Sequence, residues 1–165
     1  MTKNDKIYRI VSIFSFIVHI CLFVFVLIVG FLPYRTSQNF YECIVGFYGT
    51  TGLAAFSPYI LMLILLVACL FAFLAVNNRP ILLFWAAALS LTFFVGALLP
   101  YLFEAAFVGF VSPWINGSMS EYGIGFKLLS GASYIFYFDI AVLAYLIIGL
   151  VVKIINGVPK GYKNI

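Results

Sequence analysis

Two ionisable side chains, His19 and Asp139, stand inside long apolar segments of the sequence. A charged residue at the middle of a membrane helix costs about 2.5 to 3.5 kcal/mol on insertion scales, so it normally faces a bundle interior and has a partner. Counted from the helix ends at a rise of about 1.5 Å per residue, the two depths differ by only about 5 to 8 Å. The sequence therefore predicts an intramembrane polar pair of His19 and Asp139, in direct contact or bridged by water.

A polar stripe leads to His19 along the first apolar segment. Tyr8, Ser12, Ser15 and His19 are spaced 4, 3 and 4 residues apart, which places them on one face of a helix. Such a stripe can form a proton or cation path toward Asp139. It can equally serve as interhelical hydrogen bonding, which contributes about 0.6 to 2 kcal/mol for each pair.

The residues that catalysis or metal binding would need are sparse. One histidine rules out a multi-histidine metal centre, and the single embedded acid rules out a membrane aspartic peptidase. Cys21, Cys43 and Cys69 are isolated from one another, so no redox pair of the C-x-x-C type is present. We expect no enzymatic activity, no cofactor and no metal, and we expect Cys43 to be a free thiol or an intermolecular link.

The composition defines the class of protein to which these residues belong. Of the 165 residues, 65% are hydrophobic and only 8% are charged, and the mean hydropathy is +1.19. Soluble domains carry about 25% charged residues, and a bilayer core requires about 20 apolar residues per helix. We predict an all-α integral membrane protein whose single domain, residues 1–165, is a bundle of four transmembrane helices. The expected helices cover residues 9–32, 57–76, 80–100 and 132–152, and the connecting outer segments cover residues 33–56 and 101–131.

The positive charges predict the orientation of the chain. Seven lysines and arginines flank one side of the predicted bundle, and two flank the other. The seven are Lys3, Lys6, Arg9, Arg79, Lys153, Lys160 and Lys163, and the two are Arg35 and Lys127. Cytoplasmic loops carry the excess of positive charge, so we expect both termini in the cytoplasm and the protein in the plasma membrane. The net charge of +4 is thus a signal of topology and does not indicate nucleic-acid binding.

The two outer segments are too apolar for solvated loops. We expect them to form an outer cap at the membrane interface, which either docks a partner or a lipid or only covers the bundle. The residues that we assign to the binding surface of this cap are Glu42, Cys43, Phe47, Tyr48, Phe110 and Trp114.

Small residues predict close helix packing. Ala88, Thr92 and Gly96 recur every four positions, as do Ala68 and Ala72, and such faces let two helix backbones approach closely.

A short sequence pattern occurs once in each half of the chain. Residues 29–34 and 95–101 both end an apolar segment with a Val-Gly start and a Pro-Tyr finish. Two parallel repeats of a helical hairpin would explain this pattern. The general preference of Pro and Tyr for helix ends at the membrane interface would explain it as well.

Two functional hypotheses follow from this sequence. The first is a small non-enzymatic tetraspan protein, an accessory subunit, regulator or immunity-type binder of another membrane protein or of membrane lipid. The second is a component of a proton- or cation-coupled transporter or channel that uses Asp139 and His19, either within a homo-oligomer or with a partner.

Overall fold

Four long helices dominate the structure, a computed structural model that describes residues 3–35, 37–77, 79–97 and 123–155. These described residues are mostly helical. Each long helix is apolar and long enough to cross a membrane, with mean hydropathies of 2.8, 2.7, 2.0 and 2.5 in chain order. This confirms the prediction of an all-α integral membrane protein. The helices are α1 (Lys3–Val29), α3 (Ser57–Ala75), α4 (Pro80–Ala97) and α6 (Ile124–Ile155).

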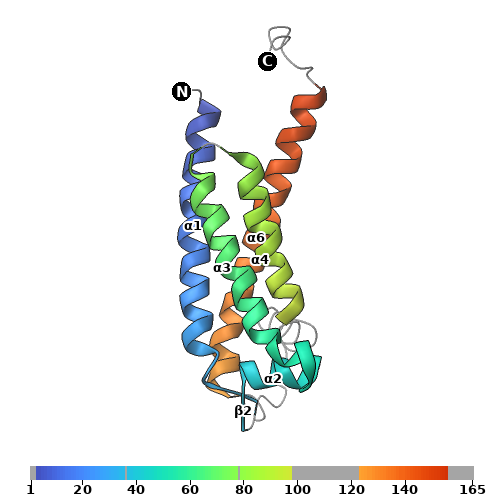
Figure 1. Ribbon diagram of the computed structural model, residues 1–165. Coiled ribbons are helices and arrows are strands. Elements are labelled where there is room, and N and C mark those ends of the chain that lie inside the picture. The colour runs from blue at the N-terminus through green and yellow to red at the C-terminus, as the bar shows by residue number, and fades with distance from the viewer. Residues whose placement is uncertain (1–2, 36, 78, 98–122, 156–165) are drawn as a thin grey trace.

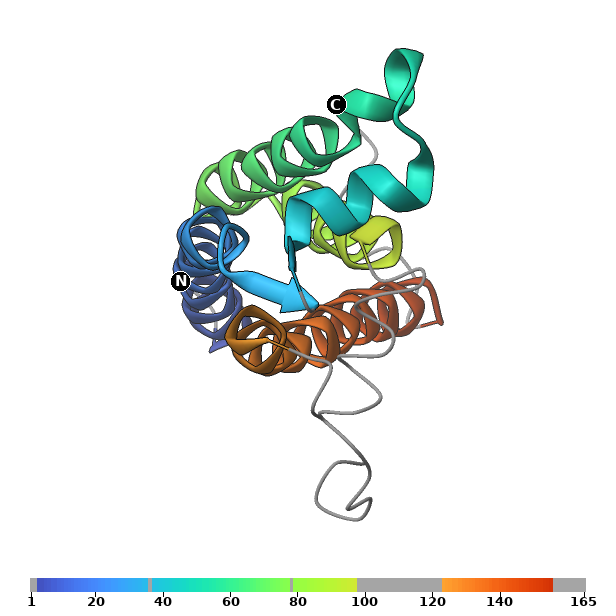
Figure 2. The same ribbon diagram turned by 90° about the horizontal axis from the view of Figure 1, so that it is seen from below.

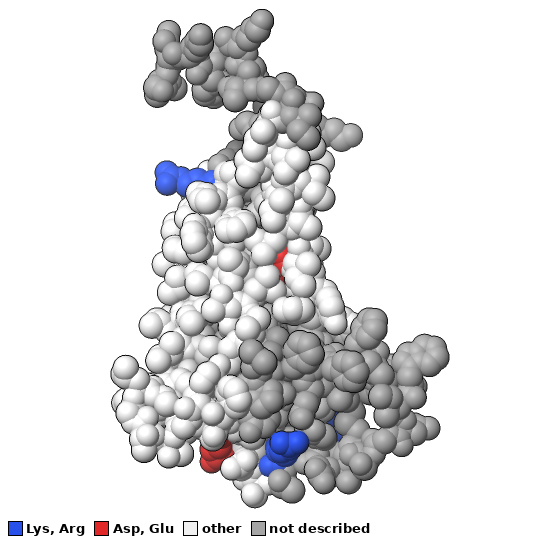
Figure 3. All heavy atoms as spheres, turned by 90° about the vertical axis from the view of Figure 1, so that its right-hand side faces the viewer, with Lys and Arg blue, Asp and Glu red and all other residues white. Residues whose placement is uncertain are grey.

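The four helices form a ring in the order α1, α3, α4, α6 (Figures 1 and 2). Neighbours run in opposite directions, so α1 begins and α6 ends at the same end of the bundle, which we call the terminal end (Figure 1). The opposite end, which carries α2 (Phe40–Tyr48), we call the α2 end. The face of the molecule shown in Figure 3 is almost uncharged between these two ends, as a lipid-facing surface requires.

Two helices have boundaries that differ from the predicted ones. Helix α1 begins at Lys3 and ends at Val29, whereas we expected residues 9–32. Helix α6 begins at Ile124, whereas we expected it to begin at residue 132, so residues 124–131 belong to the bundle and not to an outer segment. Hydropathy marks the apolar core of a membrane helix, but the helical backbone continues past that core for as long as its hydrogen bonds are satisfied.

The connection from α1 to α3 folds into a compact structure at the α2 end. A two-stranded antiparallel hairpin, β1 (Pro33–Arg35) and β2 (Gln38–Asn39), leads directly into α2. Asn39 and Glu42 form a capping box at the start of α2, in which each side chain accepts a hydrogen bond from the backbone of the other residue. The 3-10 helix η1 (Gly52–Phe56) then joins α2 to α3. Helix α2 lies across the end of the bundle (Figures 1 and 2).

The apolar core is divided into two clusters. The larger cluster fills the half of the bundle near the α2 end and includes Leu22, Val26, Leu65, Phe93, Phe94 and Phe126. The smaller cluster lies toward the terminal end and consists of Ala75, Leu83, Ala87 and Val142. Five fully buried polar residues, described in the next subsection, belong to neither cluster.

The second predicted outer segment and the internal repeat are not tested by this fold. Residues 101–122 of that segment lie outside the described residues, as do Phe110, Trp114 and residues 98–100 at the predicted end of the third helix. The repeat of two helical hairpins therefore stays a prediction.

The start of α6 gives a test of the packing between α6 and β1. A Cβ atom at Gly125 would lie 2.8 Å from the carbonyl oxygen of Leu32 and 2.9 Å from that of Pro33. The variant Gly125→Ala should therefore unfold at lower temperature in detergent, with a loss of about 1 to 3 kcal/mol from overpacking. Gly131→Ala is the control, because a Cβ atom there meets nothing within 4 Å. Equal melting temperatures for the two variants would contradict this packing.

Candidate functional site

Three polar side chains meet at the centre of the bundle. His19 on α1, Ser90 on α4 and Asp139 on α6 all have 0% exposure. The Nε2 atom of His19 lies 3.4 Å from Oδ1 of Asp139, and the Ser90 side chain faces the Asp139 carboxyl group. The structure thus brings together the two residues that the sequence predicts to pair, and it adds Ser90. We call these three residues the polar cluster.

A hydrogen bond to the backbone fixes the orientation of His19. Its Nδ1 atom lies 2.6 Å from the carbonyl oxygen of Ser15, one turn earlier on α1. A carbonyl oxygen can only accept, so Nδ1 carries a proton. In the neutral imidazole Nε2 is then an unprotonated acceptor, and it faces a carboxyl oxygen that is also an acceptor when ionised. The contact is favourable only when a proton lies between them, on either Asp139 or His19.

The polar cluster has unused hydrogen-bonding capacity. His19 Nε2, Ser90 Oγ and both carboxyl oxygens of Asp139 are buried without a hydrogen-bond partner among the described residues. A buried polar group left unsatisfied costs about 1 to 3 kcal/mol. Buried polar groups in folded proteins normally have hydrogen-bond partners, so this unused capacity makes the polar cluster the candidate site of the chain.

The polar stripe on α1 makes one contact within itself, between the Ser15 hydroxyl and His19 Nδ1 at 3.3 Å, whereas the hydroxyl groups of Tyr8 and Ser12 bind backbone atoms. Ser12 and Ser15 have 0% exposure. The Tyr8 hydroxyl donates to the carbonyl oxygen of Ala75 at 3.1 Å and so joins α1 to the end of α3. The Ser12 hydroxyl donates to the carbonyl oxygen of Tyr8 at 3.0 Å. The stripe therefore provides helix-to-helix hydrogen bonding at Tyr8, and Ser12 and Ser15 lie on the same helix between Tyr8 and His19.

The predicted packing seams are only partly correct. Ala68 and Ala72 are fully buried on α3. On α4, however, Thr92 is exposed and Ala88 and Gly96 are only partly buried. The buried face of α4 consists instead of Leu83, Ala86, Ala87, Ser90, Phe93, Phe94 and Ala97. Thr92 can face lipid because its hydroxyl donates to the carbonyl oxygen of Ala88 at 2.9 Å.

The predicted outer-cap surface contains one misplaced residue. Phe47 and Tyr48 on α2 are 45% and 42% exposed, and Glu42 is exposed as well. Cys43 is buried at 2% exposure, because it lies on the inward face of α2, so it does not belong to a binding surface. Burial raises the pKa of the Cys43 thiol, an effect that exceeds the lowering by Arg35, and the residue is a free thiol.

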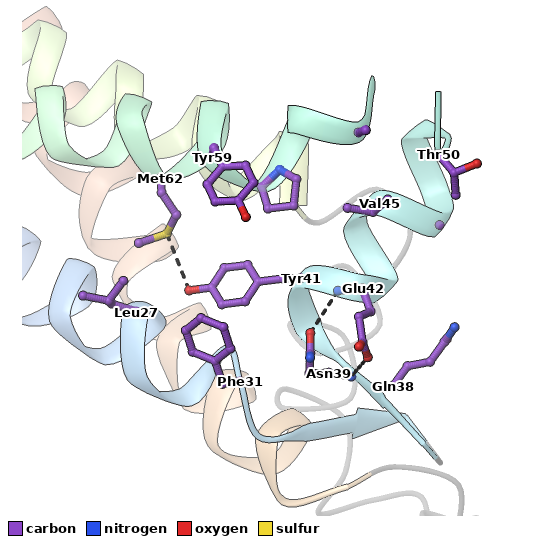
Figure 4. Close-up of a pocket in the computed structure, with 13 residues that line it drawn as sticks. Leu27, Phe31, Gln38, Asn39, Tyr41, Glu42, Val45, Thr50, Tyr59 and Met62 are labelled. Atoms are coloured by element: carbon purple, nitrogen blue, oxygen red, sulfur yellow. Dashed lines mark hydrogen bonds between the residues drawn. The ribbon is translucent and has the colours of Figure 1, made fainter. Parts of the chain in front are cut away.

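A pocket of about 630 Å³ at the α2 end was not predicted (Figure 4). Its walls come from α1, α2 and the start of α3, and Tyr41 points into it between Phe31 and Met62. The Tyr41 hydroxyl donates to the carbonyl oxygen of Val26 at 2.8 Å. Burial raises the pKa of Tyr41 to about 12, so the phenol stays protonated as this donor at neutral pH. Aromatic residues at the ends of the apolar segments are the one signal in the sequence that points here.

The described residues contain no group of three or more His, Cys, Asp or Glu side chains that would hold a metal ion. The fold and the polar cluster define a polytopic helical membrane protein with an embedded ionisable site. Comparison with known protein families, with curated proteins and with solved structures finds no match to the chain.

Replacement of the cluster residues tests whether the two ionisable side chains act as a pair. His19→Leu leaves the Asp139 carboxyl group buried without its partner, so we expect it to destabilise the bundle by about 3 kcal/mol. The double variant His19→Leu/Asp139→Leu should be more stable than His19→Leu, since no unpaired polar group is left. Unfolding free energies in detergent measure both effects. Additive losses in the double variant would show that the side chains do not interact.

Proposed function

We propose that this chain is a component of a proton-coupled membrane transport system in which the polar cluster takes up and releases a proton. The observation that carries the proposal is the contact of His19 Nε2 with Asp139 Oδ1 at 3.4 Å between two fully buried side chains, beside the equally buried Ser90. Ionisable residues at this depth mark ion pathways and proton relays more often than they serve as adhesion alone.

The chemistry of the cluster favours a proton over a metal cation. The His19–Asp139 pair is uncharged overall when it holds one shared proton, and it gains or loses one unit of charge when a further proton binds or the shared proton leaves. Imidazole changes its charge near physiological pH in its ordinary state. A sodium or magnesium ion prefers a cage of oxygen ligands, whereas this cluster offers a nitrogen base, one carboxyl group and one hydroxyl group.

The surroundings of the cluster favour exchange with the terminal end. Toward that end, the α1 face presents the hydroxyl groups of Ser15, Ser12 and Tyr8. Toward the α2 end, the same helix presents Leu22 and Val26 to a core that also contains Phe93 and Phe94. The cluster would thus have polar groups on the side of the terminal end and bulky apolar side chains on the side of the α2 end. A proton would exchange more readily on the polar side.

The charge distribution supports an orientation with the terminal end in the cytoplasm. Lys6 and Arg9 near the start of α1, and Arg79 in the turn before α4, lie at the terminal end, whereas Arg35 and Lys127 lie at the α2 end. By the positive-inside rule, the cluster would exchange protons with the cytoplasm. The plasma membrane is the location that we propose.

The accessory or regulatory role stays a second prediction. A partner protein would dock on the exposed α2 residues Phe47 and Tyr48. A non-enzymatic role is part of both proposals.

Infrared spectroscopy of the reconstituted protein tests proton binding directly. The protonated Asp139 carboxyl group should give a carboxylic acid band whose intensity falls as the pH is raised and the shared proton leaves the pair. The band should be absent in Asp139→Asn. In His19→Gln the intensity of the band should change at a different pH than in the wild type.

Thr92→Ala is the matched control, because this variant removes an exposed hydroxyl group from α4 and leaves the cluster intact. Proteoliposomes with a trapped pH indicator give the second readout. Proton uptake above that of empty vesicles should occur with the wild type and with Thr92→Ala, and should be lost in Asp139→Asn. A carboxyl band that does not titrate, together with equal uptake in all variants, would refute the proposal.

A further inference from the structure

The pocket at the α2 end has an apolar part and a polar part. Leu27 near the end of α1, Phe31 just after that helix, and Tyr59 and Met62 at the start of α3 form the apolar part. Glu42, Gln38 and Thr50 form the polar part on the side of α2 and β2 (Figure 4). The apolar walls come from the ends of two membrane-spanning helices, so the pocket lies where hydrocarbon meets the headgroup region.

The apolar part is open to the surroundings of the bundle. Phe31 is 67% exposed and Tyr59 is 73% exposed, although both belong to stretches next to the membrane core. Aromatic rings at this level are suited to contact both an acyl chain and a headgroup. The Tyr41 ring forms the floor between them and is held in place by its hydrogen bond to Val26.

The charge of the polar part restricts the ligand. Glu42 is the one charged side chain among the described residues that line the pocket, and no lysine or arginine lines it. One carboxyl oxygen of Glu42 accepts the capping bond from the Asn39 backbone at 2.8 Å. The Glu42 side chain is exposed, and a cationic group with N–H donors fits its carboxylate best.

We propose that this pocket binds a phospholipid with a primary ammonium headgroup, of the ethanolamine type, from the leaflet at the α2 end. The acyl chain lies against Leu27, Phe31 and Met62, and the ammonium group is held by Glu42. An anionic headgroup would meet the Glu42 carboxylate without a basic partner in the pocket, which disfavours its binding. This inference does not depend on the proton-binding role of the polar cluster.

Two substitutions separate the headgroup contact from the acyl-chain contact. Glu42→Gln removes the charge and keeps the capping box, since glutamine is also accepted at that position. Gly46→Leu adds a bulky side chain to the pocket from α2, because Gly46 lines the pocket and a Cβ atom there meets nothing within 4 Å. Gly131→Leu is the matched control, a helical glycine with equally open space on α6.

Native mass spectrometry of the full chain in mild detergent, titrated with dioleoyl phosphatidylethanolamine, phosphatidylcholine or phosphatidylglycerol, measures the binding. The wild type should bind phosphatidylethanolamine about tenfold more tightly than the other two lipids, as expected for one charge-assisted contact. Glu42→Gln should remove this preference, and Gly46→Leu should lower the occupancy of all three lipids. Gly131→Leu should behave like the wild type.

Equal binding of the three lipids to the wild type would overturn the headgroup assignment. Binding that is unchanged in Gly46→Leu would overturn the pocket as the site. A dimer or a complex with a protein partner that Gly46→Leu disrupts, with no lipid adduct in the wild type, would show that the pocket takes a helix from another chain and would overturn the lipid proposal.

Discussion

The contact between His19 and Asp139 is the constraint on which the rest of the structure depends. A carboxyl group and an imidazole cannot face lipid, and neither can be buried alone without a large energetic penalty. The contact joins the first and the last spanning helices, α1 and α6, and thereby closes the ring of four. Ser90 brings α4 to the same point. The rotation of these three helices about their own axes is therefore fixed, because their polar side chains have to lie next to one another inside the bundle.

The remaining core follows from this polar layer. Lipid tails are as apolar as leucine, so burial of apolar surface provides little drive for helix association inside a bilayer. Close contact is achieved instead with small residues, such as Ala68 and Ala72 on α3, and with bulky rings such as Phe93 and Phe94 near the α2 end. At the terminal end the tyrosine hydroxyl of Tyr8 joins α1 to α3. The helices are thus held together by side-chain packing near the α2 end and by a hydrogen bond at the terminal end.

The two candidate sites of the chain differ in what surrounds them. The polar cluster is enclosed by helices and is suited to the smallest ligand, a proton. The pocket beside Tyr41 is open at the membrane interface and is suited to an elongated amphipathic ligand. Helix α1 contributes to both, with His19 at its centre and Leu27 near its end. A chain of this size can hold two sites because neither requires a cavity inside the bundle larger than a few atoms.

The sequence by itself determined that four segments span a membrane and that His19 and Asp139 lie within it. The free energy of inserting a helix into a bilayer depends mainly on the residues of that helix. It can therefore be summed from the hydropathies of its residues without knowledge of the tertiary structure. The tertiary structure decided that Ser90 joins the cluster, that Thr92 faces outward, that Cys43 is buried, that residues 124–131 extend α6, and that a pocket forms beside Tyr41. The physical reason is that inward and outward residues of a membrane helix are equally apolar, so the sequence pattern does not specify how each helix is rotated. Only the contacts between helices specify that rotation.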